Sequence, residues 1–96
     1  MQYTVINAFG NPVRLRLLCC LAKGQKNVQD LIENCGLAQS AVSQHLTKLK
    51  QAGLVTSKKD GKFVYYNLTH HKAAKLAHEL ELFEKDVTKK EVKKNK

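Results

Sequence analysis

The fold of this chain is decided by VQDLIENCGLAQSAVSQHLTKLKQAGLV at residues 28–55 and by TSKKDGKFVYYNL at residues 56–68. The first stretch opens with apolar residues at helical spacing, followed by Gly36, and glycine tolerates the left-handed conformation that commonly ends a helix. A second apolar stripe, at Val42, Leu46 and Leu49, predicts another helix directly after a short turn. The sequence therefore predicts a helix-turn-helix.

The second predicted helix carries polar side chains on the face opposite its apolar stripe. Those near its start are short or amide-bearing, and a lysine follows further along; they are Gln39, Ser40, Ser43, Gln44 and Lys48. In a recognition helix, the N-terminal residues reach base edges and later residues meet phosphates. We therefore interpret the first four as base-reading residues and Lys48 as a phosphate contact. A solvated polar face is the alternative interpretation.

A basic hairpin follows the two helices. Residues 54–57 and 63–66 are rich in β-branched and aromatic side chains, and Asp60-Gly61 between them is a tight-turn signal. Its predicted tip is lysine-rich, with Lys58, Lys59 and Lys62. Such a tip suits a phosphate backbone or a minor groove, although lysines also protect exposed sheet edges. Because these lysines gather at the turn, we favour a DNA-binding wing.

Three motifs in order resemble the signatures of ArsR/SmtB transcriptional repressors: FGNPVRLRLL at residues 9–18, SAVSQHL at residues 40–46 and GKFVYY at residues 61–66. The resemblance spans residues 9–80. It implies a mainly α fold with a small β-hairpin wing (α+β), in which N- and C-terminal helices form a homodimer. It also implies repression by binding double-stranded DNA at an inverted-repeat operator, with release by an inducer. Ala38 departs from the family, which often has a Ser or Thr helix cap there, worth about 1 kcal/mol.

Composition agrees with a polyanionic partner, since the formal net charge is +9 and the pI is near 9.6. We expect residues 1–84 to form the winged helix-turn-helix domain. Residues 85–96, with six lysines against two acidic residues, should be a helix end or a disordered tail. The chain shows no membrane-spanning apolar stretch and no signal-peptide pattern, so we expect a cytoplasmic protein without a membrane partner.

The segments before and after the helix-turn-helix supply the framework. Asn11-Pro12 predicts a helix start, with Asn as the cap and Pro in the first position. The predicted core face of this helix consists of Leu15, Leu18, Leu21 and Ala22. Arg14 and Arg16 are interpreted either as phosphate contacts or as a charged outer face. By the family resemblance, residues 3–9 and the amphipathic residues 73–83 pack across a dimer interface; closure over their own domain is the alternative.

The inducer is not evident, because the metal sites of the family are incomplete. Residues 27–31 lack the Cys-x-Cys pair of the first site. By the resemblance, the second site falls on His70, Lys72, Phe83 and Asp86. Lysine and phenylalanine cannot ligate a divalent ion there, so we expect no metal at these sites and no cofactor. An alternative metal group could consist of His70, His71, His78 and Glu81. The favoured interpretation is that these histidines are exposed residues on a helix face.

The cysteines are Cys19, Cys20 and Cys35, which lack the spacing of a zinc knuckle and should stay reduced inside a cell. Cys19 matches the first-helix thiol of the sulfide- and redox-sensing branch of the family, whose second thiol lies on the C-terminal helix. No cysteine follows Cys35. The three cysteines are therefore candidate thiol sensors only if the Cα atom of Cys35 lies within about 6 Å of the Cα atom of Cys19 or Cys20. Inert packing is the favoured interpretation.

The sequence contains no motif that would support an enzymatic function. There is no Gly-rich phosphate loop, HExxH run or Ser/His/Asp constellation. His45 adjoins the apolar stripe of the second helix and is expected to pack or hydrogen-bond internally. The rival function is a winged helix that binds protein, which would require an apolar or acidic recognition face. The face here is polar to basic, so a DNA-binding regulator is favoured over both, and a non-specific basic DNA binder remains the other alternative.

Overall fold

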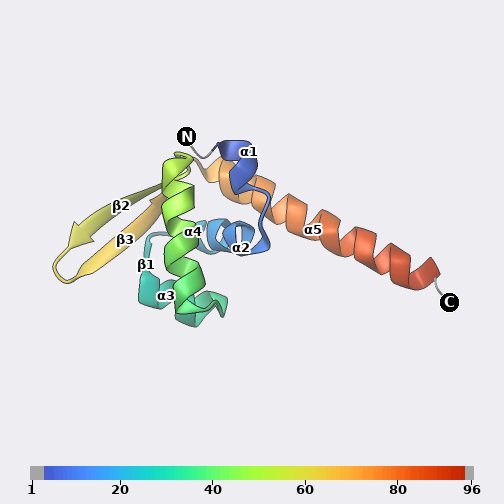
Figure 1. The fold of residues 1–96 in the computed structure, drawn as a ribbon, viewed down its shortest axis with the longest axis horizontal. Helices are drawn as coiled ribbons and strands as arrows, with labels where there is room; N and C mark the ends of the chain where they lie inside the picture. The colour runs from blue at the N-terminus through green and yellow to red at the C-terminus, as the bar shows by residue number, and fades with distance from the viewer. Residues whose placement is uncertain (1–3, 95–96) are drawn as a thin grey trace.

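The computed structural model describes residues 4–94, with side chains described to residue 89. A small body carries two projections on opposite sides, the hairpin and the C-terminal part of the last helix (Figure 1). The elements in chain order are α1 (Val5–Ala8), α2 (Pro12–Leu21), β1 (Lys26–Asn27), α3 (Val28–Cys35), α4 (Gln39–Gln51), β2 (Val55–Asp60), β3 (Phe63–Leu68) and α5 (His71–Lys94). The predicted α+β winged helix-turn-helix is confirmed.

The helix-turn-helix is held by local signals at both ends of α3. The Asn27 side chain accepts a hydrogen bond from the Asp30 backbone N–H at 2.7 Å, and Asp30 accepts one in return from the Asn27 N–H. This capping box satisfies two backbone donors that a helix start leaves without partners. Gly36 then closes the helix in the left-handed conformation, with φ +67°, and its N–H bonds the Ile32 carbonyl. The turn leads directly into α4.

The wing is part of a three-stranded antiparallel sheet in the order β1-β3-β2. Asp60 pairs with Phe63, so the two turn residues are Gly61 and Lys62, one position later than the Asp60-Gly61 turn that the sequence predicts. Gly61 has φ +66°, and a positive φ at the first turn position alone is the pattern of a type II′ hairpin. Both strands are two residues longer than predicted: β2 extends toward the turn, and β3 extends toward the body through Asn67 and Leu68.

The core lies where α2 meets α3, α4, α5 and the base of the hairpin. Its fully buried leucines are Leu17, Leu18, Leu21, Leu31, Leu46 and Leu49. Each is expected to contribute roughly 1.5–3 kcal/mol through burial. The predicted core face of α2 is correct for Leu18 and Leu21 and wrong for Ala22, which is exposed. Leu17, outside the predicted face, is also fully buried, whereas Leu15 is only partly buried.

The last helix, α5, is a single helix of 24 residues. Ala73, Ala74 and Ala77 are buried in its first turns, and these small side chains let α5 pack closely on α2. The helix continues without a break past residue 84, so the lysine-rich residues 85–94 are helical, and residues 95–96 lie outside the described part. In the described residues no helix is both long and apolar enough to span a bilayer.

Candidate nucleic-acid interface

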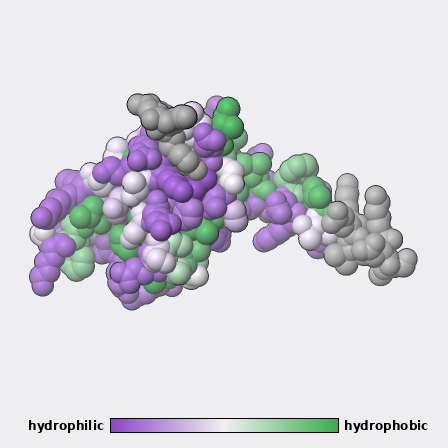
Figure 2. Space-filling view, viewed as in Figure 1, coloured by the Kyte–Doolittle hydropathy of each residue, from purple (hydrophilic) through white to green (hydrophobic). Residues whose placement is uncertain are grey.

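The recognition helix α4 separates its two faces cleanly. Val42, Leu46 and Leu49 are at most 1% exposed and fasten the helix to the core. The other sides of the helix carry the expected base-reading residues, all of them exposed: Gln39, Ser40, Ser43 and Gln44. Lys48 is partly buried. The front of the body around α4 is predominantly hydrophilic (Figure 2). The structure therefore brings the sequence-predicted residues together on one accessible helix.

The wing is joined to the recognition helix by a contact that sequence reasoning missed. The Lys50 ammonium, in the last turn of α4, donates a hydrogen bond to the Ser57 hydroxyl on β2 at 2.8 Å. A cation at this end of a helix also complements the helix dipole. Because Ser57 and Lys59 are two positions apart on one strand, both side chains lie on the ribbon face that contacts α4. Lys59 therefore lies on the same side of the wing as the recognition helix.

The other wing lysines take different positions. Lys58 pairs with Tyr65 on the opposite face of the ribbon, and Lys62 lies in the turn; both are exposed. Phe63 and Tyr65 stiffen that face through a tilted ring contact with centroids 6.3 Å apart. The three lysines thus surround the outer half of the wing instead of forming one flat patch. A ribbon of this kind can meet phosphates on either side.

Arg14 is an interior residue. It is therefore neither a phosphate contact nor part of a charged outer face, the two interpretations that the sequence suggested. It is 5% exposed, and its guanidinium donates to the backbone carbonyls of Ala8 and Asn7, each at 3.0 Å. A third contact, also 3.0 Å, joins it to His45 Nδ1. Since a guanidinium can only donate, Nδ1 accepts and the ring is neutral at that nitrogen. Arg14 therefore ties α1 and α2 to the inner side of the recognition helix.

His45 makes the internal hydrogen bond that the sequence predicts. Burial lowers the pKa of His45 from its ordinary value of 6.5, and the positive charges of Arg14 and Lys48 lower it further. All three causes disfavour the imidazolium form, which keeps the ring able to accept from Arg14. The histidine thus acts as a neutral link beneath the exposed polar side of α4.

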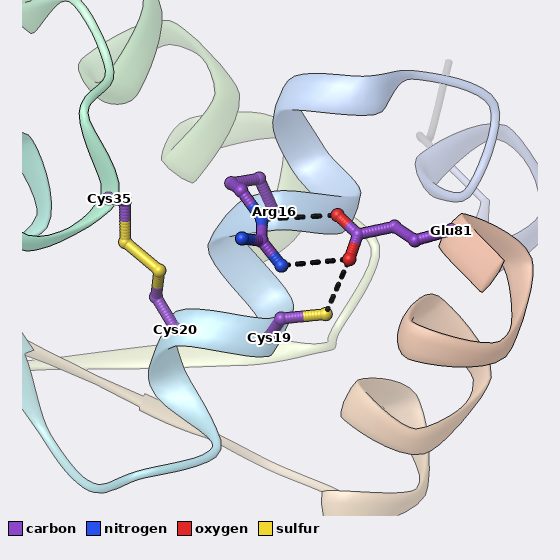
Figure 3. Close-up of a disulfide and its surroundings, with 5 residues drawn as sticks. All are labelled: Arg16, Cys19, Cys20, Cys35 and Glu81. Carbon is purple, nitrogen blue, oxygen red and sulfur yellow. Dashed lines mark hydrogen bonds and ion pairs between the residues drawn. A yellow bond between two sulfur atoms is a disulfide. The ribbon is translucent and has the colours of Figure 1, made fainter. Parts of the chain in front are cut away.

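The cysteines divide between two sides of α2 (Figure 3). Cys20 forms a disulfide with Cys35 of α3, with a Cα–Cα distance of 6.6 Å, so the expectation of reduced, inert packing is wrong for this pair. Cys19 keeps its thiol. Sequence reasoning could not choose between Cys19 and Cys20, because both precede Cys35 by nearly the same distance. The direction in which each thiol leaves α2 decides the pairing.

Cys19 points to α5, where it meets an ion pair. Its thiol lies 3.6 Å from Glu81 Oε1, and Arg16 donates to both carboxylate oxygens of Glu81, at 2.8 and 3.1 Å (Figure 3). Burial and the adjacent carboxylate raise the pKa of the Cys19 thiol, so it is protonated at neutral pH. Arg16 thus lies on the charged outer face, as one of its two interpretations holds, and its ion pair joins α2 to α5.

Comparison with known proteins identifies the family. Residues 11–57 match the family described as "Bacterial regulatory protein, arsR family". The Biofilm growth-associated repressor of Xylella fastidiosa is 36% identical over 76 residues, which cover 79% of this chain and 67% of that protein. This chain belongs to the ArsR/SmtB family. As the three motifs indicate, it is a DNA-binding winged-helix transcriptional regulator and not an enzyme.

Solved structures of relatives share the fold of this ArsR-family regulator. The transcriptional repressor BigR from Xylella fastidiosa has a TM-score of 0.71 at 35% identity, covering 81% of this chain and 80% of that one. HlyU from Vibrio cholerae has a TM-score of 0.69 at 33% identity, covering 82% and 86%. In sequence, the chain is also similar to Nodulation protein NolR of Rhizobium meliloti. The two are 42% identical over 62 residues, which cover 65% of this chain and 51% of that protein.

Proposed function

We propose that this regulator is a homodimeric repressor that binds an inverted-repeat operator and leaves it when an inducer binds. The observation that carries the proposal is the accessible polar row on α4, whose opposite side is fully buried. A helix anchored in this way can enter a major groove without losing its core contacts. Since its target would be chromosomal DNA, we expect the protein to act in the cytoplasm.

The proposed contacts divide between base edges and phosphates. Glutamine can pair bidentately with adenine, and serine can bond several bases, so the polar residues of α4 would supply sequence preference: Gln39, Ser40, Ser43 and Gln44. Lysines contact phosphates without reading sequence, and those placed to do so are Lys48 at the end of α4 and Lys58, Lys59 and Lys62 on the wing. The Lys50–Ser57 bond holds the wing beside the helix, which supports simultaneous contact by both.

The dimer is supported by an exposed apolar stripe on α5. Leu76, Leu80, Phe83 and Val87 recur at intervals of four, three and four residues and are 40–65% exposed. Figure 2 shows hydrophobic side chains gathered on this projecting helix. Contiguous exposed apolar surface marks interaction sites, and a self-complementary stripe suits a two-fold interface. Two recognition helices would then read half-sites about one turn of DNA apart.

The DNA contacts are tested by selecting bound duplexes from a randomised library at near-physiological salt, followed by titrations of two variants. We expect recovery of an inverted repeat. Gln44→Ala should relax preference at one base pair, at a cost of about 1–3 kcal/mol. Lys59→Ala should instead weaken all sequences alike and reduce the salt slope by about 0.9. Lys75→Ala, an exposed lysine on α5, is the matched control. Equal behaviour of the Gln44 and Lys59 variants would refute the division of roles.

The dimer is tested separately by sedimentation equilibrium. Phe83→Asp places a charge in the apolar stripe and should yield monomers. Leu82→Asp is the matched control, because Leu82 is 51% exposed but lies on a different side of α5. Loss of the dimer in both variants, or in neither, would contradict an interface along the stripe.

A further inference from the structure

Three side chains of different chemistry meet where α2 packs against α5. Cys19 comes from α2, and His78 and Glu81 come from α5. Their sulfur, imidazole nitrogen and carboxylate oxygen atoms all lie within 4.8 Å of one another. Cys19 and Glu81 are partly buried and His78 is exposed, so the group is reachable from solvent. Cys19 and His78 also line a surface pocket of about 420 Å³.

We propose that Cys19, His78 and Glu81 bind one thiophilic divalent cation, of which Zn²⁺ is the type. Thiolate, imidazole and carboxylate are the ligands that zinc takes, and three protein ligands leave a fourth position open to water. With Zn–S and Zn–O bonds of about 2.3 and 2.1 Å, tetrahedral geometry separates sulfur from oxygen by about 3.6 Å. Cys19 Sγ and Glu81 Oε1 already lie 3.6 Å apart. The exposed His78 would rotate inward, and Arg16 Nη2 would withdraw from Glu81 Oε1.

Charge and protons balance at this site. The Cys19 thiol releases its proton to solvent, and the thiolate and the Glu81 carboxylate together neutralise the dication. His78 binds as neutral imidazole. Glu81 Oε1 exchanges its hydrogen bond from Arg16 for the metal, while Arg16 Nε keeps its 3.1 Å bond to Oε2. An outer hydrogen bond of this kind orients a ligating carboxylate.

The position of the site separates it from other features of the chain. It shares no residue with the positions that the family resemblance gives for its second metal site. His78 is two residues from both Leu76 and Leu80, so it lies roughly 200° around the helix from the apolar stripe. A dimer contact along the stripe would leave the cation site open. The bound cation would fasten α5 to α2, and any effect on operator release rests on the proposed function.

Binding is therefore measured on the full chain without DNA. The probe is Co²⁺, whose bond to a thiolate produces a charge-transfer absorption in the near ultraviolet, followed by displacement with Zn²⁺ against a chromophoric chelator. We expect one equivalent of Co²⁺ per chain, with the thiolate band, and displacement by Zn²⁺. Cys19→Ser should abolish the band, and His78→Ala and Glu81→Gln should each weaken Zn²⁺ binding more than 100-fold, since even outer-shell changes cost about 10–100-fold.

Two controls separate this site from neighbouring groups. The double variant Cys20→Ser/Cys35→Ser should keep the band, because the disulfide lies on the other side of α2. His71→Ala should also keep it, since His71 lines the same pocket outside the group of three. Absence of the band in the natural chain, its persistence in Cys19→Ser, or its loss in the cysteine double variant would each overturn the proposal. None of these results depends on whether the protein binds an operator.

Discussion

The start of the recognition helix provides a sharp test of how this fold is stabilised. Helices α1, α2 and α3 each begin at a residue whose side chain accepts a hydrogen bond from a backbone N–H of the first turn. These capping residues are Thr4, Asn11 and Asn27. Helix α4 begins at Ala38, which has extended backbone angles (φ −72°, ψ 144°) suited to a cap but no side-chain oxygen. We therefore expect Ala38→Thr to stabilise the protein.

The size of the effect follows from the missing bond. The first intrahelical bond of α4 runs from the Val42 N–H to the Ala38 carbonyl at 3.0 Å, so the N–H groups of Ser40 and Ala41 precede it. A threonine hydroxyl can accept from one of them, which is worth about 1 kcal/mol. In a domain of this size that raises Tm by roughly 4–8 °C. Ala38 is exposed, so the larger side chain displaces no core atom.

The assay is urea and thermal unfolding followed by circular dichroism, with Ala38→Val as the matched control. Valine has the shape of threonine but a methyl group in place of the hydroxyl, so it should give no gain. Equal stabilisation by both variants would show that bulk or chain stiffness is responsible. No gain from threonine would refute the inference that α4 starts without a side-chain cap.

Three further predictions concern the interior. Arg14→Leu should lower the free energy of unfolding by at least about 3 kcal/mol in urea melts, because it leaves two backbone carbonyls and His45 without their donor. The pKa of His45 in the folded protein lies below 6.5. Its contribution to the free energy of unfolding is therefore present above pH 6.5 and is lost as the pH falls below that value. His45→Gln should therefore flatten the decline of the urea midpoint between about pH 7 and pH 5, and an unchanged slope would contradict this. Reduction by dithiothreitol should cost about 3 kcal/mol, because Cys20–Cys35 closes a 15-residue loop, and Cys20→Ser should abolish that response.

Much of the fold can be predicted because its signals are local. Asn11 and Gly36 mark helix ends through local backbone bonds, and the α4 stripe follows from helical periodicity alone. The exposure of the proposed base-reading residues follows from the same periodicity. The hairpin is also local, and its turn differs by one position because Gly61 takes the first turn place that a positive φ requires.

The errors fall on α2, where neighbours from distant parts of the chain decide each residue's environment. Its charge, and not its spacing, assigns Arg14 to the surface. Three acceptors contributed by α1 and α4 allow it to be buried. Helical periodicity places Ala22 in the core, but it is exposed.

The sequence by itself determined the helix-turn-helix, the wing that follows it and the exposed polar side of α4, because each depends on spacing within one helix or hairpin. Only the tertiary structure decided that Cys20 pairs with Cys35 and that Cys19 meets His78 and Glu81. Adjacent residues on a helix point about 100° apart, so two neighbouring cysteines serve different partners. Which partner each one meets depends on how α3 and α5 pack around α2, and no local pattern records that packing.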